Sequence, residues 1–236
     1  MLEPVAYEAD GIRMIGQMAL GEGARKRPGI LVAHESFGLT PHIVSVARRL
    51  ADLGYAAFAL DYQGGGVPLA DRDEMSRRYR AFMADPSRIR RRAAAAFEVL
   101  TSHPLVDVDR MAAIGYCYGG TAVLELARSG ADLKAVVGFH GGLATARPED
   151  AVNIKGKILV CLGADDPLIR PEERLTFENE MTAANVDWRL NLYGGAVHSF
   201  TNPEIPFSMP PGFAYDARAD ARSWRAMLDL FDETLR

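Results

Sequence analysis

The chain has 236 residues, a formal net charge of −4 and 48% apolar residues, which suits an α/β fold of one domain over residues 1–236. The two cysteines are too few for a disulfide framework, and the slightly acidic balance lacks the basic face of a nucleic-acid-binding protein. The first ten residues lack the pattern of a signal peptide, and no apolar run approaches the roughly 20 residues that span a bilayer. We therefore expect a cytoplasmic protein without membrane or nucleic-acid partners.

The chain alternates between buried-strand patterns and helical patterns. The predicted strands cover residues 5–9, 12–20, 29–33, 55–60, 110–114, 134–139, 157–162 and 187–193. The predicted helices cover residues 43–50, 71–83, 87–102, 120–129, 171–184 and 217–235. The basic run at residues 88–92 falls in the third helix and predicts a solvated face. Such alternation indicates an α/β fold with a doubly wound, mostly parallel sheet flanked by helices, in which chemistry gathers at the carboxyl ends of the strands.

Cys117 is the candidate nucleophile. It lies in Gly115-Tyr-Cys-Tyr-Gly119, between a predicted buried strand and a predicted helix. This is the strand–elbow–helix context of the G-x-S-x-G motif of α/β-hydrolases, with a cysteine in place of the serine. The sharp turn leaves no room for side chains at the two glycines, and the helix N-terminus favours a thiolate. Cys161, inside a strand pattern, is interpreted as a core residue.

A thiol nucleophile needs a base and a group that orients the base. In the α/β-hydrolase order of nucleophile, acid and histidine, Asp165 and Asp166 compete for the acid, and the turn pattern favours Asp166. Of the five histidines, only His198 follows the acid in the sequence. His140 ends another strand, where a structural role is favoured over a place in the pocket. The spacing of cysteines and histidines predicts no metal site, and no cofactor is expected.

Backbone amides are the expected donors to the developing oxyanion. One is the amide of Tyr118, directly after the nucleophile, and the other follows the strand 29–33, where Ser36 is favoured over Phe37. The glycine run at residues 64–66 meets Val67-Pro68 instead of opening a helix, so it predicts a mobile loop near the pocket and not a dinucleotide site.

The motifs together resemble those of the dienelactone hydrolase family, over about residues 28–231. The segments that carry the resemblance are His34-Glu-Ser-Phe-Gly38, Asp61-Tyr62, Gly115-Tyr-Cys-Tyr-Gly-Gly120, Gly163-Ala-Asp-Asp-Pro167 and Gly195-Ala-Val-His-Ser-Phe200. The resemblance implies a Cys-His-Asp triad at Cys117, His198 and Asp166. It also implies that Glu35 tunes the resting protonation of the Cys117 thiol and exchanges partners with it when substrate binds.

One position departs from the family pattern. Members that cleave dienelactone hold the substrate carboxylate with arginines, one of them four residues after the triad histidine, where this chain has Asn202. A second arginine would come from the middle helical segment, where Arg77, Arg78 and Arg80 are candidates. A more neutral ester or lactone is therefore the expected small-molecule substrate. The candidate substrate-binding residues are Phe37, Tyr116, Ser199 and Asn202, with Phe207, Phe213 and Tyr215 as further apolar walls.

Three functional hypotheses follow. The first is hydrolysis of activated esters or lactones through a thioester, because a thiolate expels poor leaving groups badly. The second is hydrolysis of aryl phosphotriesters by the same metal-free residues, as a side activity. The third is a non-catalytic binding protein on a hydrolase scaffold. No motif distinguishes a monomer from a homodimer.

Overall fold

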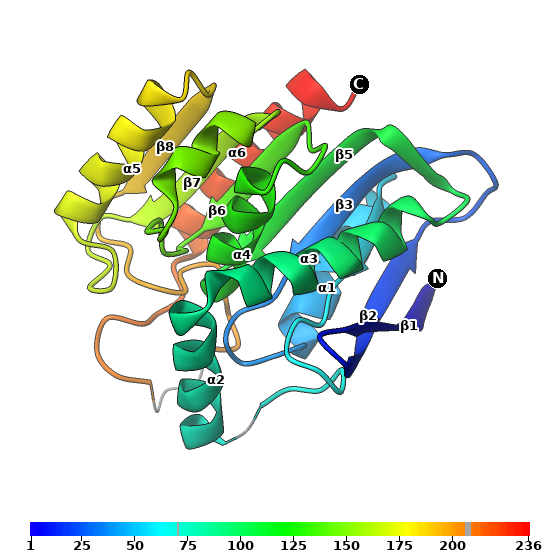
Figure 1. Ribbon diagram of the computed structural model, residues 1–236, viewed down its shortest axis with the longest axis horizontal. Coiled ribbons are helices and arrows are strands. Elements are labelled where there is room, and N and C mark those ends of the chain that lie inside the picture. Colours follow the sequence, from blue (N-terminus) through cyan, green and yellow to red (C-terminus); the bar gives the residue numbers. More distant parts are fainter. Residues whose placement is uncertain (70, 206–208) are drawn as a thin grey trace.

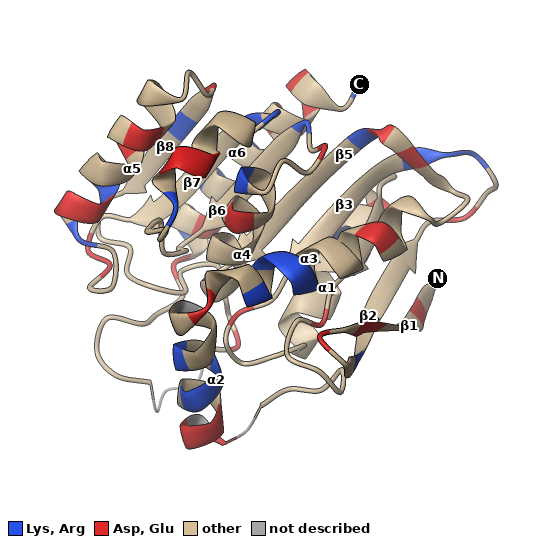
Figure 2. Cartoon of the chain, in the orientation of Figure 1, with Lys and Arg blue, Asp and Glu red and all other residues tan. Residues whose placement is uncertain are grey.

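A computed structural model describes residues 1–69, 71–205 and 209–236. Phe207, considered above as a wall of the pocket, lies outside these residues. No helix in the described part of the chain is long and apolar enough to cross a membrane. Acidic and basic residues are spread over several helices and loops (Figure 2).

Eight strands form one sheet in the order β1-β2-β4-β3-β5-β6-β7-β8. β1 and β4 pair antiparallel with β2, and all the other neighbours are parallel, so the predicted mostly parallel sheet is confirmed (Figure 1). The strands are β1 (Leu2–Ala9), β2 (Ile12–Leu20), β3 (Arg27–Ala33), β4 (Ala56–Ala59), β5 (Val106–Tyr116), β6 (Ala135–Phe139), β7 (Lys157–Gly163) and β8 (Trp188–Tyr193).

Helices cover both faces of the sheet, with α3, α4 and α5 on one face and α1 and α6 on the other (Figure 1). Their bounds are α1 (Pro41–Asp52), α2 (Arg72–Ala84), α3 (Pro86–Thr101), α4 (Tyr118–Arg128), α5 (Pro171–Ala183) and α6 (Ala217–Thr234). A 3-10 helix, η1 (Pro148–Asn153), was not predicted from the sequence.

The core has two halves because successive side chains of a strand point to opposite faces of the sheet. In β3, Leu31 and Ala33 pack in the half covered by α3, α4 and α5. Ile30 and Val32 pack in the half covered by α1 and α6. Strands buried on both faces are almost wholly apolar, which is why their sequences identify them well but reveal little about their partners.

The predicted solvated face at residues 88–92 is wrong for two arginines. Arg92 is buried, and its guanidinium donates to the carbonyl of Tyr62 and pairs with Asp10. Arg90 is largely buried between Glu125 and Asp150. These guanidinium groups join α3 to its neighbours, because a buried charge is tolerated only when it is paired and hydrogen-bonded.

Asp61 organises the segment after β4. Its buried carboxylate accepts hydrogen bonds from the amides of Ile15 (3.1 Å), Gln63 (3.0 Å), Gly64 (2.8 Å) and Gly66 (2.7 Å). The glycine run that the sequence suggested to be a mobile loop near the pocket is therefore tied to β2. None of its residues lines the pocket of Cys117 described below.

Asp61→Asn should lower the free energy of unfolding by about 2–3 kcal/mol, because an amide group cannot accept from all four donors and leaves buried amides unpaired. Denaturant unfolding of the variant beside the wild type measures the change. The matched control is Asp109→Asn at an exposed position, for which we expect less than about 0.5 kcal/mol. Equal stability of the two variants would contradict the role of Asp61.

Candidate active site

Cys117 occupies a sharp turn between β5 and α4. It is the N-cap residue of α4 and has a φ of 52°, a left-handed conformation that is strained for a residue with a side chain. The turn is possible because its flanking residues are glycines. A Cβ atom on Gly115 would lie 2.0 Å from the carbonyl oxygen of Gly119, and one on Gly119 would lie 2.3 Å from that of Ala33. The elbow predicted from the sequence is therefore present, with its thiol partly exposed.

His140 supports the elbow from behind. The Cys117 amide donates to the carbonyl of Phe139 at 2.9 Å and lies 3.1 Å from Nδ1 of His140. Nε2 of His140 lies 2.8 Å from the hydroxyl of Thr201. Burial, with the nearby His198 and His42, holds the pKa of His140 well below its ordinary value. The neutral ring can thus accept at Nδ1 and donate at Nε2, which agrees with the structural role favoured from the sequence.

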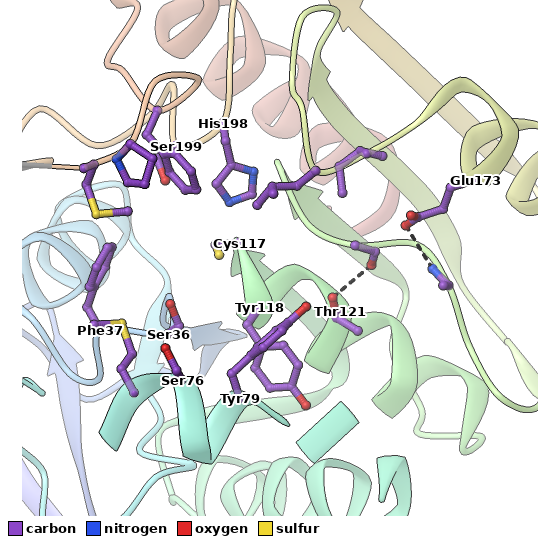
Figure 3. Close-up of a pocket in the computed structure, with 18 residues that line it drawn as sticks. Ser36, Phe37, Ser76, Tyr79, Cys117, Tyr118, Thr121, Glu173, His198 and Ser199 are labelled. Atoms are coloured by element: carbon purple, nitrogen blue, oxygen red, sulfur yellow. Dashed lines mark hydrogen bonds between the residues drawn. The ribbon is translucent and has the colours of Figure 1, made fainter. Parts of the chain in front are cut away.

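His198 and Asp166 form a buried pair. Nδ1 of His198 lies 2.8 Å from one carboxylate oxygen of Asp166, and the other oxygen accepts from the amide of Leu168 at 2.8 Å. Asp165 is exposed, so the structure favours Asp166 as the sequence did. Nε2 of His198 is buried and hydrogen-bonds to no described residue. The ring faces the sulfur of Cys117 (Figure 3).

The charges around His198 favour its protonated form. Burial lowers the pKa of the ring, but the charge of Cys117 and the contact with Asp166 outweigh it and raise the pKa to about 10. The cysteine charge is the largest of the influences that raise this pKa. His198 therefore faces the Cys117 sulfur as an imidazolium near neutral pH.

A cavity of about 470 Å³ opens over Cys117 (Figure 3). Four residues predicted from the sequence line it with Cys117 and His198, namely Ser36, Phe37, Tyr118 and Ser199. Phe213 also lines it, whereas Tyr215 is exposed and bonds to Asp220 instead. Further lining residues that the sequence did not suggest are Met75, Ser76, Tyr79, Thr121, Gly142, Ala144, Leu168, Ile169, Glu173, Met209 and Pro210.

Two predicted substrate-binding residues are not on the cavity wall. Tyr116 is buried on the α1 and α6 side of the sheet, where its ring stacks on Phe139 at 4.8 Å. Asn202 is buried, and its amide nitrogen donates to the Glu35 carboxylate at 2.7 Å. Both predictions are therefore wrong. Period-two alternation could have revealed the first, since Tyr116 shares a face of β5 with Ile114.

Glu35 lies behind the cavity and is fully buried. Besides the bond from Asn202 to one of its oxygens, its other oxygen has no hydrogen-bond partner in the described part of the chain. Burial raises the pKa of Glu35 to about 7, although Asn202, His198 and Ser199 act in the opposite direction. The side chain is thus poised to gain or lose a proton near neutral pH.

No lysine or arginine lines the cavity among the described residues. Arg77 and Arg78, candidates for a carboxylate clamp, pair with Glu74, and Arg78 also donates to the carbonyl of Gln63. Within the described ranges, no group of three or more His, Cys, Asp or Glu side chains is arranged to hold a metal ion.

The sheet order, the elbow and the paired histidine and aspartate define a member of the α/β-hydrolase class. A model of the dienelactone hydrolase family matches residues 14–235, and the chain belongs to this family. It is accordingly an enzyme, a hydrolase of esters or lactones, which removes the support for a purely binding role.

Three known proteins illustrate the similarity. A solved dienelactone hydrolase-like promiscuous phosphotriesterase from metagenomic libraries is 44% identical, with a TM-score of 0.95 over 100% of this chain and 99% of that one. An uncharacterized protein of Caenorhabditis elegans is 36% identical over 62% of this chain and 94% of its own length. A carboxymethylenebutenolidase of Pseudomonas sp. is 28% identical over 89% of each chain.

Cys117→Ala should lower the pKa of His198 from about 10 toward its ordinary value of 6.5, because it removes the cysteine charge and leaves the cost of burial. An NMR titration of the His198 ring in the two proteins measures the change. Cys161→Ala, at a buried strand position 0% exposed, is the control and should leave the His198 titration in place. A wild-type His198 that titrates near 6.5 would contradict the raised pKa of this ring.

Glu35→Gln should change how stability depends on pH. Because the pKa of Glu35 is raised from 4.5 to about 7, its contribution to stability is fully present below pH 4.5 and is lost as pH rises through about 7. Glu35→Gln has no carboxyl group to titrate, so its stability does not fall in this way as the pH rises. We expect the difference in unfolding free energy, variant minus wild type, to increase by about 2.5 kcal/mol between pH 5 and pH 8. A difference that stays constant with pH in denaturant titrations would contradict a protonated Glu35.

Proposed function

We propose that this enzyme hydrolyses activated carboxylic esters and lactones with Cys117 as nucleophile, His198 as general acid and base, and Asp166 as the group that orients His198. The observation that carries the proposal is the His198–Asp166 contact of 2.8 Å on the wall of the same cavity as the strained elbow of Cys117. A buried imidazole held at Nδ1 by a carboxylate presents Nε2 to the reacting atoms.

In the first half of the proposed reaction, the Cys117 thiolate attacks the substrate carbonyl carbon and a C–S bond forms. The carbonyl oxygen becomes an oxyanion, which the backbone amides of Ser36 and Tyr118 stabilise. The position of Tyr118 as the first residue of α4 supports this role, because the first backbone amides of a helix have no hydrogen-bond partner within the helix. As the oxyanion collapses, the C–O bond breaks, and Nε2 of His198 gives its proton to the leaving oxygen.

In the second half, neutral His198 takes a proton from water while the water oxygen attacks the thioester carbon. The C–S bond then breaks and returns the Cys117 thiolate, the imidazolium and a free carboxylic acid. Thiolates expel alkoxides poorly, so the first half favours aryl esters and enol lactones, whose leaving groups are stable anions. The apolar walls of the cavity, which include Phe37, Leu168 and Phe213, fit such groups.

Phosphotriester hydrolysis is a second candidate activity. It is favoured by the 44% identity and the TM-score of 0.95 to a promiscuous phosphotriesterase. Attack of the Cys117 thiolate on phosphorus would form an S–P bond and break the P–O bond to the aryl group, which leaves as a phenolate and takes the proton of His198. Water that gives a proton to His198 would then attack phosphorus and break the S–P bond, which returns the thiolate and releases a dialkyl phosphate. The phosphoryl oxygen gains negative charge in the same place as the carbonyl oxygen of an ester, so the same amides would serve it.

Cys117→Ala should reduce kcat/KM for 4-nitrophenyl acetate by at least about 10³-fold, since it removes the group that forms the covalent bond. The same loss is expected for an aryl enol lactone and for an aryl diethyl phosphate, if one thiolate serves all three substrates. Release of the chromophore measures each rate. Mass spectrometry of the quenched reaction should detect the acyl group on the peptide of Cys117.

The control is Cys161→Ala, which alters the other cysteine at a fully buried position and should lose less than about threefold. Ester turnover that survives in Cys117→Ala would overturn the proposal. Loss of ester turnover with retention of phosphotriester turnover would show instead that the second activity uses another nucleophile.

A further inference from the structure

Glu173 gives the active-site cavity an unexpected carboxylate. It is the only acidic residue among the described residues that line the cavity, and it lies in the first turn of α5. One of its oxygens accepts from the amides of Leu143 (2.6 Å) and Ala144 (3.2 Å). Figure 3 draws Glu173 at one end of the cavity, with Cys117 and His198 near the middle. The side chain is thus fixed by two backbone donors.

A second hollow of about 550 Å³ adjoins the cavity, and the two share Ala144, Leu168 and Glu173. The second hollow is also lined by Arg170, Glu172 and Glu180. Within the first cavity no described lysine or arginine offsets Glu173. A substrate chain directed from Cys117 toward α5 therefore meets uncompensated negative charge.

Tyr79, on the α2 wall of the cavity, responds to this charge. Burial raises the pKa of its hydroxyl, and the charges of Cys117 and Glu173 raise it further. Glu173 and Tyr79 both line the cavity, from α5 and α2 respectively. In a partly apolar enclosure such a charge is screened less than at an open surface, so a charged group on the substrate would experience it strongly.

We propose that Glu173 is a specificity-determining residue that selects ester substrates whose acyl or leaving chain carries a positive charge, and rejects chains that carry a carboxylate. This inference rests on the proposed function for the identity of the reaction. It adds that the preferred substrate carries a positive charge and that Glu173 is the residue that recognises this charge.

Three 4-nitrophenyl esters of similar length test the inference. They are the neutral hexanoate, the anionic hemi-adipate and the cationic 6-(trimethylammonio)hexanoate. The values of kcat/KM are measured for the wild type, Glu173→Gln and Glu172→Gln at low and high salt. The control, Glu172, is an exposed neighbour in the same helical turn that lines only the second hollow. Ratios between esters cancel any effect of a variant on the chemistry they share.

In the wild type we expect kcat/KM to be about tenfold higher for the cationic ester than for the neutral ester, and about tenfold lower for the anionic ester. Both ratios should approach one at high salt. Glu173→Gln should bring both ratios within about twofold of one, since the glutamine keeps an acceptor for the two amides but carries no charge. Glu172→Gln should keep the wild-type ratios. Equal rates for the three esters in the wild type, or unchanged ratios in Glu173→Gln, would overturn the inference.

A second measurement does not depend on ester hydrolysis. Iodoacetate and iodoacetamide alkylate thiols and differ by a negative charge, and the rate at Cys117 is followed by mass spectrometry. The ratio of the iodoacetate rate to the iodoacetamide rate should rise severalfold in Glu173→Gln and not in Glu172→Gln. If no ester is turned over but this ratio rises, the proposed function fails and the charge selection stands. An unchanged ratio, with ester turnover present, overturns the charge selection alone.

Discussion

The close approach of Gly119 to the end of β3 is the constraint on which the site depends. Only a residue without a side chain can lie against the Ala33 carbonyl oxygen, where a Cβ atom would be 2.3 Å away. This contact draws the start of α4 against the loop that carries Glu35 and Ser36. It also fixes the left-handed turn at Cys117. The strain at that residue is offset by the two core halves packed on either side of β5, so the fold's stability holds the thiol in place.

The titratable side chains of the site lie on two sides of the Cys117 sulfur. His198 lies on the cavity side of the sulfur and is supported by Asp166, whereas Glu35 lies behind, supported by Asn202. Neutral groups complete the surroundings, since burial keeps His34 and His140 uncharged near neutral pH by lowering the pKa of each. Apart from Cys117, the paired His198 and Asp166 therefore have neutral groups as neighbours here, with Glu35 gaining a charge only as it loses its proton.

The sequence predicted the parts of the site that depend on local pattern. Strand, elbow and helix each leave a signal within ten residues of Cys117. The chain order indicated His198 as the candidate base, and the turn pattern favoured Asp166 over Asp165. The wall of the cavity could not be predicted in this way. The α2 helix was expected, but nothing in its own sequence shows that Met75 and Tyr79 face Cys117. Glu173 resembles any acidic residue in the first turn of a helix, and only the tertiary contact with Leu143 distinguishes it.

The position of α2 has an evolutionary consequence. Phe82 is its one residue in the described core, and its ring stacks on Tyr118, while the turns before it supply Met75 and Tyr79 to the cavity. A substitution at Met75 changes the cavity wall alone, whereas one at Tyr79 also changes the packing of Tyr118, whose ring lies 5.3 Å from that of Tyr79. A lineage can therefore reshape the substrate cavity through Met75 and Ser76 while the elbow and the two core halves stay as they are.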